Sequence, residues 1–148
     1  TYPPFLVDTV MVTETRTISL DAGSHMVKIK EEYRGIDQPF TVTAGIVERT
    51  EGKIISLPEI TAGIAYSLDG GEGGITYLGS LLTDSPFIGI KEKSGHLLLL
   101  TTYTPGQPLI YYTGAGWSKW GFDNETAWQN YLSRFADRIN KPLEITLE

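Results

Sequence analysis

The fold is decided by residues 9–33, which read TVMVTETRTISL, DAGS and HMVKIKEEY in succession. The first and third segments have the composition of β-strands, and in the third Val27 and Ile29 alternate with lysines. A period of two places alternate side chains on one face of a strand. The four residues between the segments are turn formers, and Gly23 accepts a positive φ angle. We therefore predict a hairpin of two long antiparallel strands.

Short strands are predicted along most of the remaining chain. Glycine (16 residues) and proline (8 residues) separate short segments that are rich in β-branched and aromatic residues. We predict strands at residues 40–48, 53–57, 63–68, 75–82, 87–91, 96–103, 108–117 and 143–147. Over residues 124–139 the apolar residues recur at helical spacing, Asp123 or Asn124 caps the start, and Pro142 ends the helix. The predicted fold is one mainly β domain over residues 1–148, an antiparallel β-sandwich with one C-terminal amphipathic helix.

The composition excludes several kinds of partner and site. The formal net charge of −6 disfavours binding to nucleic-acid phosphates and anionic lipids, so we expect neither nucleic acid nor a membrane as partner. The chain has no cysteine, which excludes disulfides, thiolate catalysis and cysteine-ligated metals. It begins at Thr1 and not at methionine, so we expect either a processed chain or part of a longer protein.

Common catalytic motifs are not found in the sequence. There is no G-x-S-x-G elbow, and the two histidines, His25 and His96, are too far apart in sequence to indicate a metal site. The segment DGGEGG at residues 69–74 has no Gly-Lys-Ser/Thr ending and is acidic, so we interpret it as a flexible hairpin loop. Nothing in the sequence requires a metal or an organic cofactor.

Two charged residues interrupt an apolar strand face. Glu14 and Arg16 share their predicted face with Val10, Val12 and Ile18. Charges in the middle of such a face indicate a bulge, an edge strand or the floor of a polar cleft. The sequence leaves these three alternatives open.

The segment YYTGAGWSKW at residues 111–120 has the strongest composition for ligand binding. It brings four aromatic residues, two glycines and Lys119 to the junction between the last long strand and the helix. Flat aromatic faces and a few polar groups are what a sugar site needs. The alternative is that Trp117 and Trp120 only pack the helix against the sandwich.

The chain also resembles a bacterial family of unknown function that is associated with polysaccharide utilisation, especially of pectin-like and other uronate-containing glycans. The resembling segments are residues 17–24 (TISLDAGS), 44–49 (AGIVER), 96–98 (HLL), 111–119 (YYTGAGWSK) and 140–143 (NKPL). The resemblance covers nearly the whole chain and the C-terminal half of the family's usual length. It implies a galactose-mutarotase-like super-sandwich, whose ligands bind on a concave sheet face.

Together, the residues and the resemblance predict a carbohydrate-active protein that acts on uronate-containing oligosaccharides. The sequence does not specify the reaction. In this hypothesis His96 is the general acid or base and Glu48 is its carboxylate partner. Arg49 and Lys119 bind the substrate carboxylate, and Tyr112 and Trp117 form the stacking platform.

Two other functions remain open on the sequence. One is a non-catalytic glycan-binding module, with aromatics on an open face and no convergent acid–base pair. The other is a structural half-domain, completed by a missing N-terminal half or by a homodimer partner. The resemblance favours a periplasmic or secreted bacterial protein, without excluding the cytoplasm.

Overall fold

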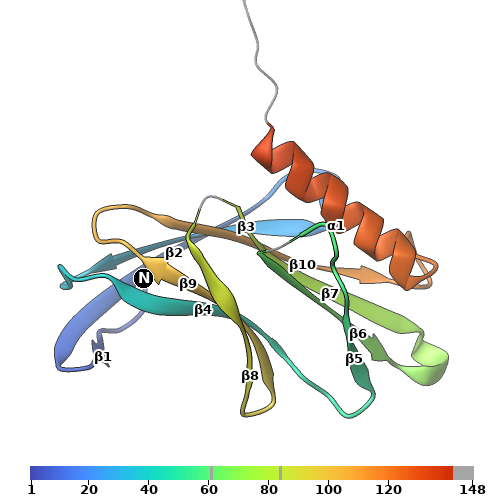
Figure 1. Ribbon diagram of the computed structural model, residues 1–148, viewed down its shortest axis with the longest axis horizontal. Helices are drawn as coiled ribbons and strands as arrows, with labels where there is room; N and C mark the ends of the chain where they lie inside the picture. The colour runs from blue at the N-terminus through green and yellow to red at the C-terminus, as the bar shows by residue number, and fades with distance from the viewer. Residues whose placement is uncertain (61, 84, 142–148) are drawn as a thin grey trace, which may run out of the picture.

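The computed structural model describes residues 1–60, 62–83 and 85–141. Pro142 and the strand predicted at residues 143–147 therefore lie outside the described residues. Within them the chain forms two antiparallel sheets and one helix near the C-terminus, as Figure 1 shows. The predicted fold class is confirmed.

The larger sheet has seven strands in the order β1-β2-β3-β10-β7-β6-β5. Their bounds are β1 (Phe5–Val7), β2 (Val10–Leu20), β3 (Met26–Arg34), β5 (Gly52–Ile55), β6 (Gly63–Asp69), β7 (Ile75–Leu82) and β10 (Leu109–Trp117). The hairpin predicted from residues 9–33 is present as β2 and β3, in register from Thr13↔Arg34 to Leu20↔Val27. Strand β1, which the sequence did not predict, pairs with the start of β2.

The smaller sheet has three strands in the order β4-β9-β8, namely β4 (Phe40–Val47), β9 (His96–Tyr103) and β8 (Phe87–Lys93). It lies against one face of the larger sheet (Figure 1). Apolar residues of both sheets alternate inward there, as a sandwich requires. The shared core includes Val12, Ile29, Tyr33, Ala44, Ile46, Ile64, Tyr66, Leu97, Leu99, Tyr103, Leu109 and Tyr111.

The helix α1 (Glu125–Asn140) covers the other face of the larger sheet. Asn124 is its N-cap and accepts a hydrogen bond from the Ala127 N–H at 3.0 Å, which satisfies one of the unpaired amides of the first turn. Trp128, Leu132 and Phe135 are the buried residues of the helix and pack on the sheet. The predicted amphipathic helix is therefore confirmed.

The acidic glycine-rich segment connects β6 to β7. It contains a single 3₁₀ turn at Gly71–Gly73, and Asp69 Oδ1 accepts a hydrogen bond from the Gly71 N–H at 2.8 Å. Among the described residues no helix is long and apolar enough to span a membrane. The same residues contain no group of three or more His, Asp or Glu side chains placed to hold a metal ion.

Candidate functional site

A cavity of about 540 Å³ lies beside α1. One side of the helix lines it, because Ala127, Tyr131, Arg134 and Arg138 follow one another at intervals of four, three and four residues. Asp137 also borders it, and Phe122 contributes from the segment before the helix. The volume is within the usual range for small-molecule sites.

Four rings are clustered at the Phe122 end of this cavity. His25 contacts Phe122, Tyr131 and Trp120 at centroid distances of 4.8, 5.4 and 5.7 Å. The His25 backbone N–H donates to Tyr131 Oη at 2.8 Å, which fixes the turn before β3 to the helix. Trp120 is 69% exposed, so a large part of its indole is accessible to a ligand.

The charges around the cavity are predominantly basic. In the described part of the chain, the Arg134 side chain makes no hydrogen bond or ion pair, and the Arg138 guanidinium lies 5.8 Å from the Phe135 ring centroid. Asp137 contacts Lys141 at 3.6 Å. Two arginines one helical turn apart therefore present guanidinium groups on one side of α1, on a protein whose formal net charge is −6.

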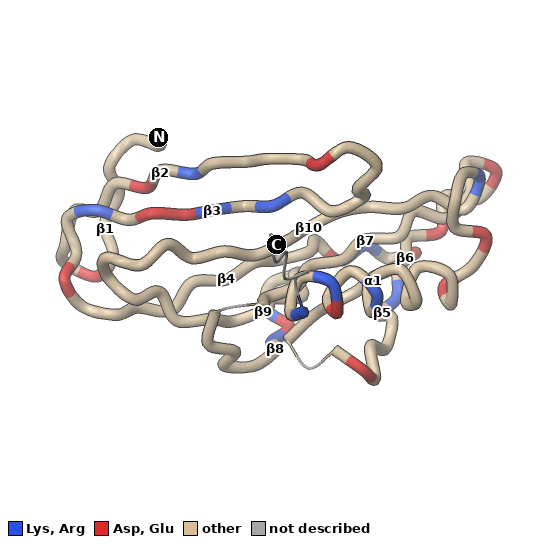
Figure 2. Tube along the Cα trace, turned by 90° about the horizontal axis from the view of Figure 1, so that it is seen from above, with Lys and Arg blue, Asp and Glu red and all other residues tan. Residues whose placement is uncertain are grey.

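The adjoining sheet surface adds a further cation. Lys28 is exposed and lies opposite Tyr112 in the β3–β10 ladder, two residues after Met26, which α1 buries. Because side chains alternate along a strand, Lys28 and Met26 are on the same face. Figure 2, which looks onto α1, shows that the helix leaves β2 and much of β3 uncovered.

Three of the predicted site residues lie together on the other side of the larger sheet. Val47 of β4 pairs with His96 of β9, and the Glu48 N–H donates to the Gly95 carbonyl at 2.9 Å. Arg49 follows directly. His96 Nδ1 is 2.9 Å from the Ser94 carbonyl, and no hydrogen bond or ion pair joins it to Glu48 within the described residues.

The structure separates the other three predicted residues from that group. Tyr112 is only 8% exposed and packs edge-to-face on Phe135 beneath α1, so it does not serve as an open stacking platform. Trp117 donates Nε1–H to the Gly73 carbonyl at 2.9 Å, and Lys119 donates to the Glu72 carbonyl. Both side chains hold the β6–β7 loop. The six residues predicted from sequence thus do not form one site.

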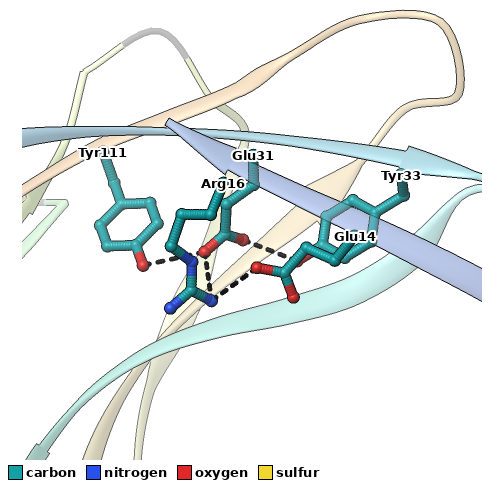
Figure 3. Close-up of polar contacts among 5 residues, drawn as sticks. All are labelled: Glu14, Arg16, Glu31, Tyr33 and Tyr111. Atoms are coloured by element: carbon teal, nitrogen blue, oxygen red, sulfur yellow. Dashed lines mark hydrogen bonds and ion pairs between the residues drawn. The ribbon is translucent and has the colours of Figure 1, made fainter. Parts of the chain in front are cut away.

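Glu14 and Arg16 belong to a polar cluster on the sandwich side of the larger sheet (Figure 3). Arg16 Nη2 lies 2.8 Å from Glu14 Oε1 and 2.7 Å from Glu31 Oε1. The β2–β3 register is regular here, so the bulge alternative is wrong. Among the described residues, no strand pairs with the other side of β2 beyond Val12, which agrees with the edge-strand alternative.

Glu31, which is 1% exposed, is the centre of this cluster. Its carboxylate accepts hydrogen bonds from Tyr33 Oη at 2.6 Å and Tyr111 Oη at 3.0 Å. Burial, together with the Glu31 charge, raises the pKa of both tyrosines, so their hydroxyls stay protonated donors.

The electrostatics of Glu14 and Arg16 have opposing causes. Burial and the nearby Glu31 charge raise the pKa of Glu14, although Arg16 lowers it. Burial lowers the pKa of Arg16, but the carboxylates beside it outweigh this effect and raise it overall. Arg16 Nε is buried without a hydrogen-bond partner, and the contact of Arg16 with Glu14 Oε1 is an ion pair without hydrogen-bond geometry. The cluster is thus an ionic network between strands.

No sequence pattern indicated the cavity beside α1. Exposed arginines on an amphipathic helix are typical of a solvated face, and neither Arg134 nor Arg138 belongs to a motif. The cavity depends on Phe122, which precedes the helix, and on ring contacts with His25 from a distant turn. The proximity of Trp120 to His25 was equally unpredictable from spacing.

The comparison with family models identifies the chain's family. Residues 1–145 match the model described as "Domain of unknown function (DUF4861)", and the chain belongs to this family. The comparisons with curated proteins and with solved structures found no match. The family description assigns no activity, so any function has to be argued from the site.

Proposed function

We propose that this domain binds uronate-containing oligosaccharides in the cavity beside α1. The observation that carries the proposal is the arginine pair Arg134 and Arg138, which borders a cavity of about 540 Å³. The exposed Trp120 lies near its Phe122 end, in contact with the His25 ring that Phe122 and Tyr131 also contact. A guanidinium group matches a carboxylate in a planar, two-pronged geometry. The rings at the Phe122 end supply the flat apolar surface that a sugar face requires.

Local charge supports an acidic ligand. The chain as a whole carries a formal net charge of −6, whereas beside α1 two guanidinium groups have no ion-pair partner among the described residues. A uronate therefore gains attraction beside these two cations. A neutral sugar of the same size would make the ring contacts without the carboxylate contacts. The expected selectivity is for acidic over neutral oligosaccharides.

The arrangement favours binding over catalysis at this cavity. The proposed acid–base residues His96 and Glu48 are on the smaller sheet, and α1 is on the opposite face of the larger sheet. If His96 and Glu48 were catalytic, a sugar would also have to bind on the side of the larger sheet that faces the smaller sheet. We propose a periplasmic or secreted location, which the resemblance to a family associated with polysaccharide utilisation favours.

Isothermal titration with trigalacturonate and with its neutral methyl ester tests this function. We expect the acid to bind wild-type protein, and the double variant Arg134→Gln/Arg138→Gln to bind it at least tenfold more weakly, since two charge-assisted contacts are lost. Arg34→Gln is the matched control, because Arg34 is exposed on β3 and makes no ion pair in the described chain. Equal affinities of the double variant and wild type would contradict the proposal.

Proton NMR of the same mixtures separates binding from turnover. Line broadening of the sugar signals without new species is the expected result for a binding module. New sugar resonances that grow with time would show a reaction. Their loss in His96→Gln would then assign the reaction to the smaller sheet.

A further inference from the structure

A second cavity, of about 350 Å³, lies between the two sheets on the side opposite α1. Strands β4, β6, β7 and β10 all contribute to it, and most of its lining is apolar. The described residues that line it are Gly45, Ile46, Val47, Arg49, Tyr66, Leu68, Leu78, Thr113 and Gly114, and among them Arg49 is the one charged residue. None of these residues lines the cavity beside α1.

Arg49 is fixed by its backbone and free at its guanidinium group. Tyr66 Oη accepts a hydrogen bond from the Arg49 N–H at 2.8 Å and donates one to the Arg49 carbonyl, also at 2.8 Å. The Arg49 side chain makes no hydrogen bond or ion pair with any residue that the structure describes. The fold thus anchors one cation at an apolar cavity and leaves its charge unneutralised.

The apolar surface continues beyond the cavity across the larger sheet. Thr113 of β10 lies opposite Val27 of β3, and Val27 lies opposite Leu20 of β2, so these side chains share one face. On the same face Ile18 and Leu20 are 62% and 61% exposed. From β6 to β2 there are four strand spacings of about 4.8 Å, roughly 19 Å in all.

We propose that this cavity and the adjoining sheet face bind a carboxylate with a long apolar chain, of the fatty-acid type. The carboxylate would meet Arg49, and the chain would cover Leu78, Thr113, Val27 and Leu20. The exposed side chains of Ile18 and Leu20 favour an apolar ligand, because apolar surface is unfavourable in water. The guanidinium group of Arg49, which has no ion-pair partner among the described residues, favours an anionic head group. An oligosaccharide fits poorly, since its hydroxyls would be left unpaired against this surface.

Titration with dodecanoate below its micelle concentration tests the inference, with 1-dodecanol as the ligand that lacks the carboxylate. The variants are Arg49→Gln for the head and Leu20→Ser for the chain, and Arg34→Gln is the charge-matched control. Leu20 and Arg49 are exposed, so neither substitution disturbs the core. Calorimetry gives the dissociation constant, and amide shifts in an NMR titration give the location.

We expect saturable 1:1 binding of dodecanoate that shifts the amides of Val47 and Thr113. Arg49→Gln should weaken it about tenfold or more, Leu20→Ser several-fold, and Arg34→Gln not at all. Absence of saturable binding, an unchanged affinity in Arg49→Gln, or shifts confined to α1 would each overturn the inference. Trigalacturonate binding by Arg49→Gln should stay at the wild-type level, so the two proposals succeed or fail separately.

Discussion

Arg16 lies directly opposite Glu31 in the β2–β3 ladder, and its Nη2 atom is 2.7 Å from Glu31 Oε1. The same carboxylate accepts hydrogen bonds from Tyr33 and Tyr111. This pair therefore connects β2 and β3 to β10 through one buried charge. It accounts for charged residues on a strand face that is otherwise apolar.

Replacing Glu31 should be the most destabilising polar substitution in this cluster. Glu31→Gln removes the charge beside Arg16 and weakens the acceptor for both hydroxyls, so we expect the free energy of unfolding to fall by about 3 kcal/mol. Urea denaturation measures it. Glu32→Gln is the control, because Glu32 forms an exposed pair with Lys30 at 3.0 Å and should change stability by less than about 1 kcal/mol. Equal losses in the two variants would rule out a central role for Glu31.

The neighbouring carboxyl of Glu14 should make stability depend on pH in a defined direction. Its pKa in the folded state is raised above 4.5 by burial and by Glu31. The folded state therefore holds this proton more tightly than the unfolded state does, and the resulting stability is lost as the pH rises through the folded pKa. Glu14→Gln resembles the protonated form. We expect it to equal wild type in stability near pH 4 and to exceed it at pH 7.

Urea unfolding of both proteins at several pH values between 4 and 8 checks this prediction. The stability difference should grow in favour of the variant from about pH 4.5 upwards and then reach a plateau. A difference that grows in favour of wild type would mean that the Arg16 contact dominates over burial.

The sequence predicted the elements better than their contacts. Strands β2 and β3 were predicted because their side chains alternate with a period of two, and the helix because its apolar residues recur with a period near 3.6. Strand β1 was missed because Phe5–Val7 is only three residues long. Its position depends on pairing with β2 through a tight turn in which Asp8 has φ 52°.

The sequence did not predict the cavity beside α1, because which residues are buried depends on what packs against each face. Tyr111 and Tyr112 point to opposite faces of β10, and both are buried because the smaller sheet covers one face and α1 the other. Composition alone made Tyr112 look like a sugar platform. Conversely, Arg134 looked like an ordinary surface residue until the fold placed it at a cavity with Phe122. Periodicity predicts on which face of a strand or helix a side chain lies, whereas predicting a site also requires knowing which element covers that face.

The close approach of α1 to the sheet depends on glycine at position 116. A Cβ atom there would lie 2.6 Å from the Phe122 ring and 2.9 Å from Trp128. We expect Gly116→Ala to lower the free energy of unfolding by about 2 kcal/mol, because the rings are buried and cannot move aside freely. Gly73→Ala is the matched control, since a Cβ at Gly73 would meet no atom within 4 Å. Thermal and urea denaturation should show a loss only in the first variant.

The last prediction distinguishes the two exposed tryptophans of residues 111–120. Trp120 contacts His25 at the ring end of the cavity beside α1, whereas Trp117 is tied to the β6–β7 loop through the Gly73 carbonyl. If a sugar stacks beside α1, Trp120→Ala should weaken trigalacturonate binding about tenfold, a loss of about 1.4 kcal/mol, which is typical of one aromatic contact. Trp117→Ala should leave the affinity unchanged, although it loosens the loop. Calorimetry on both variants decides the assignment, and a loss with Trp117→Ala alone would move the proposed site to the β6–β7 end of the larger sheet.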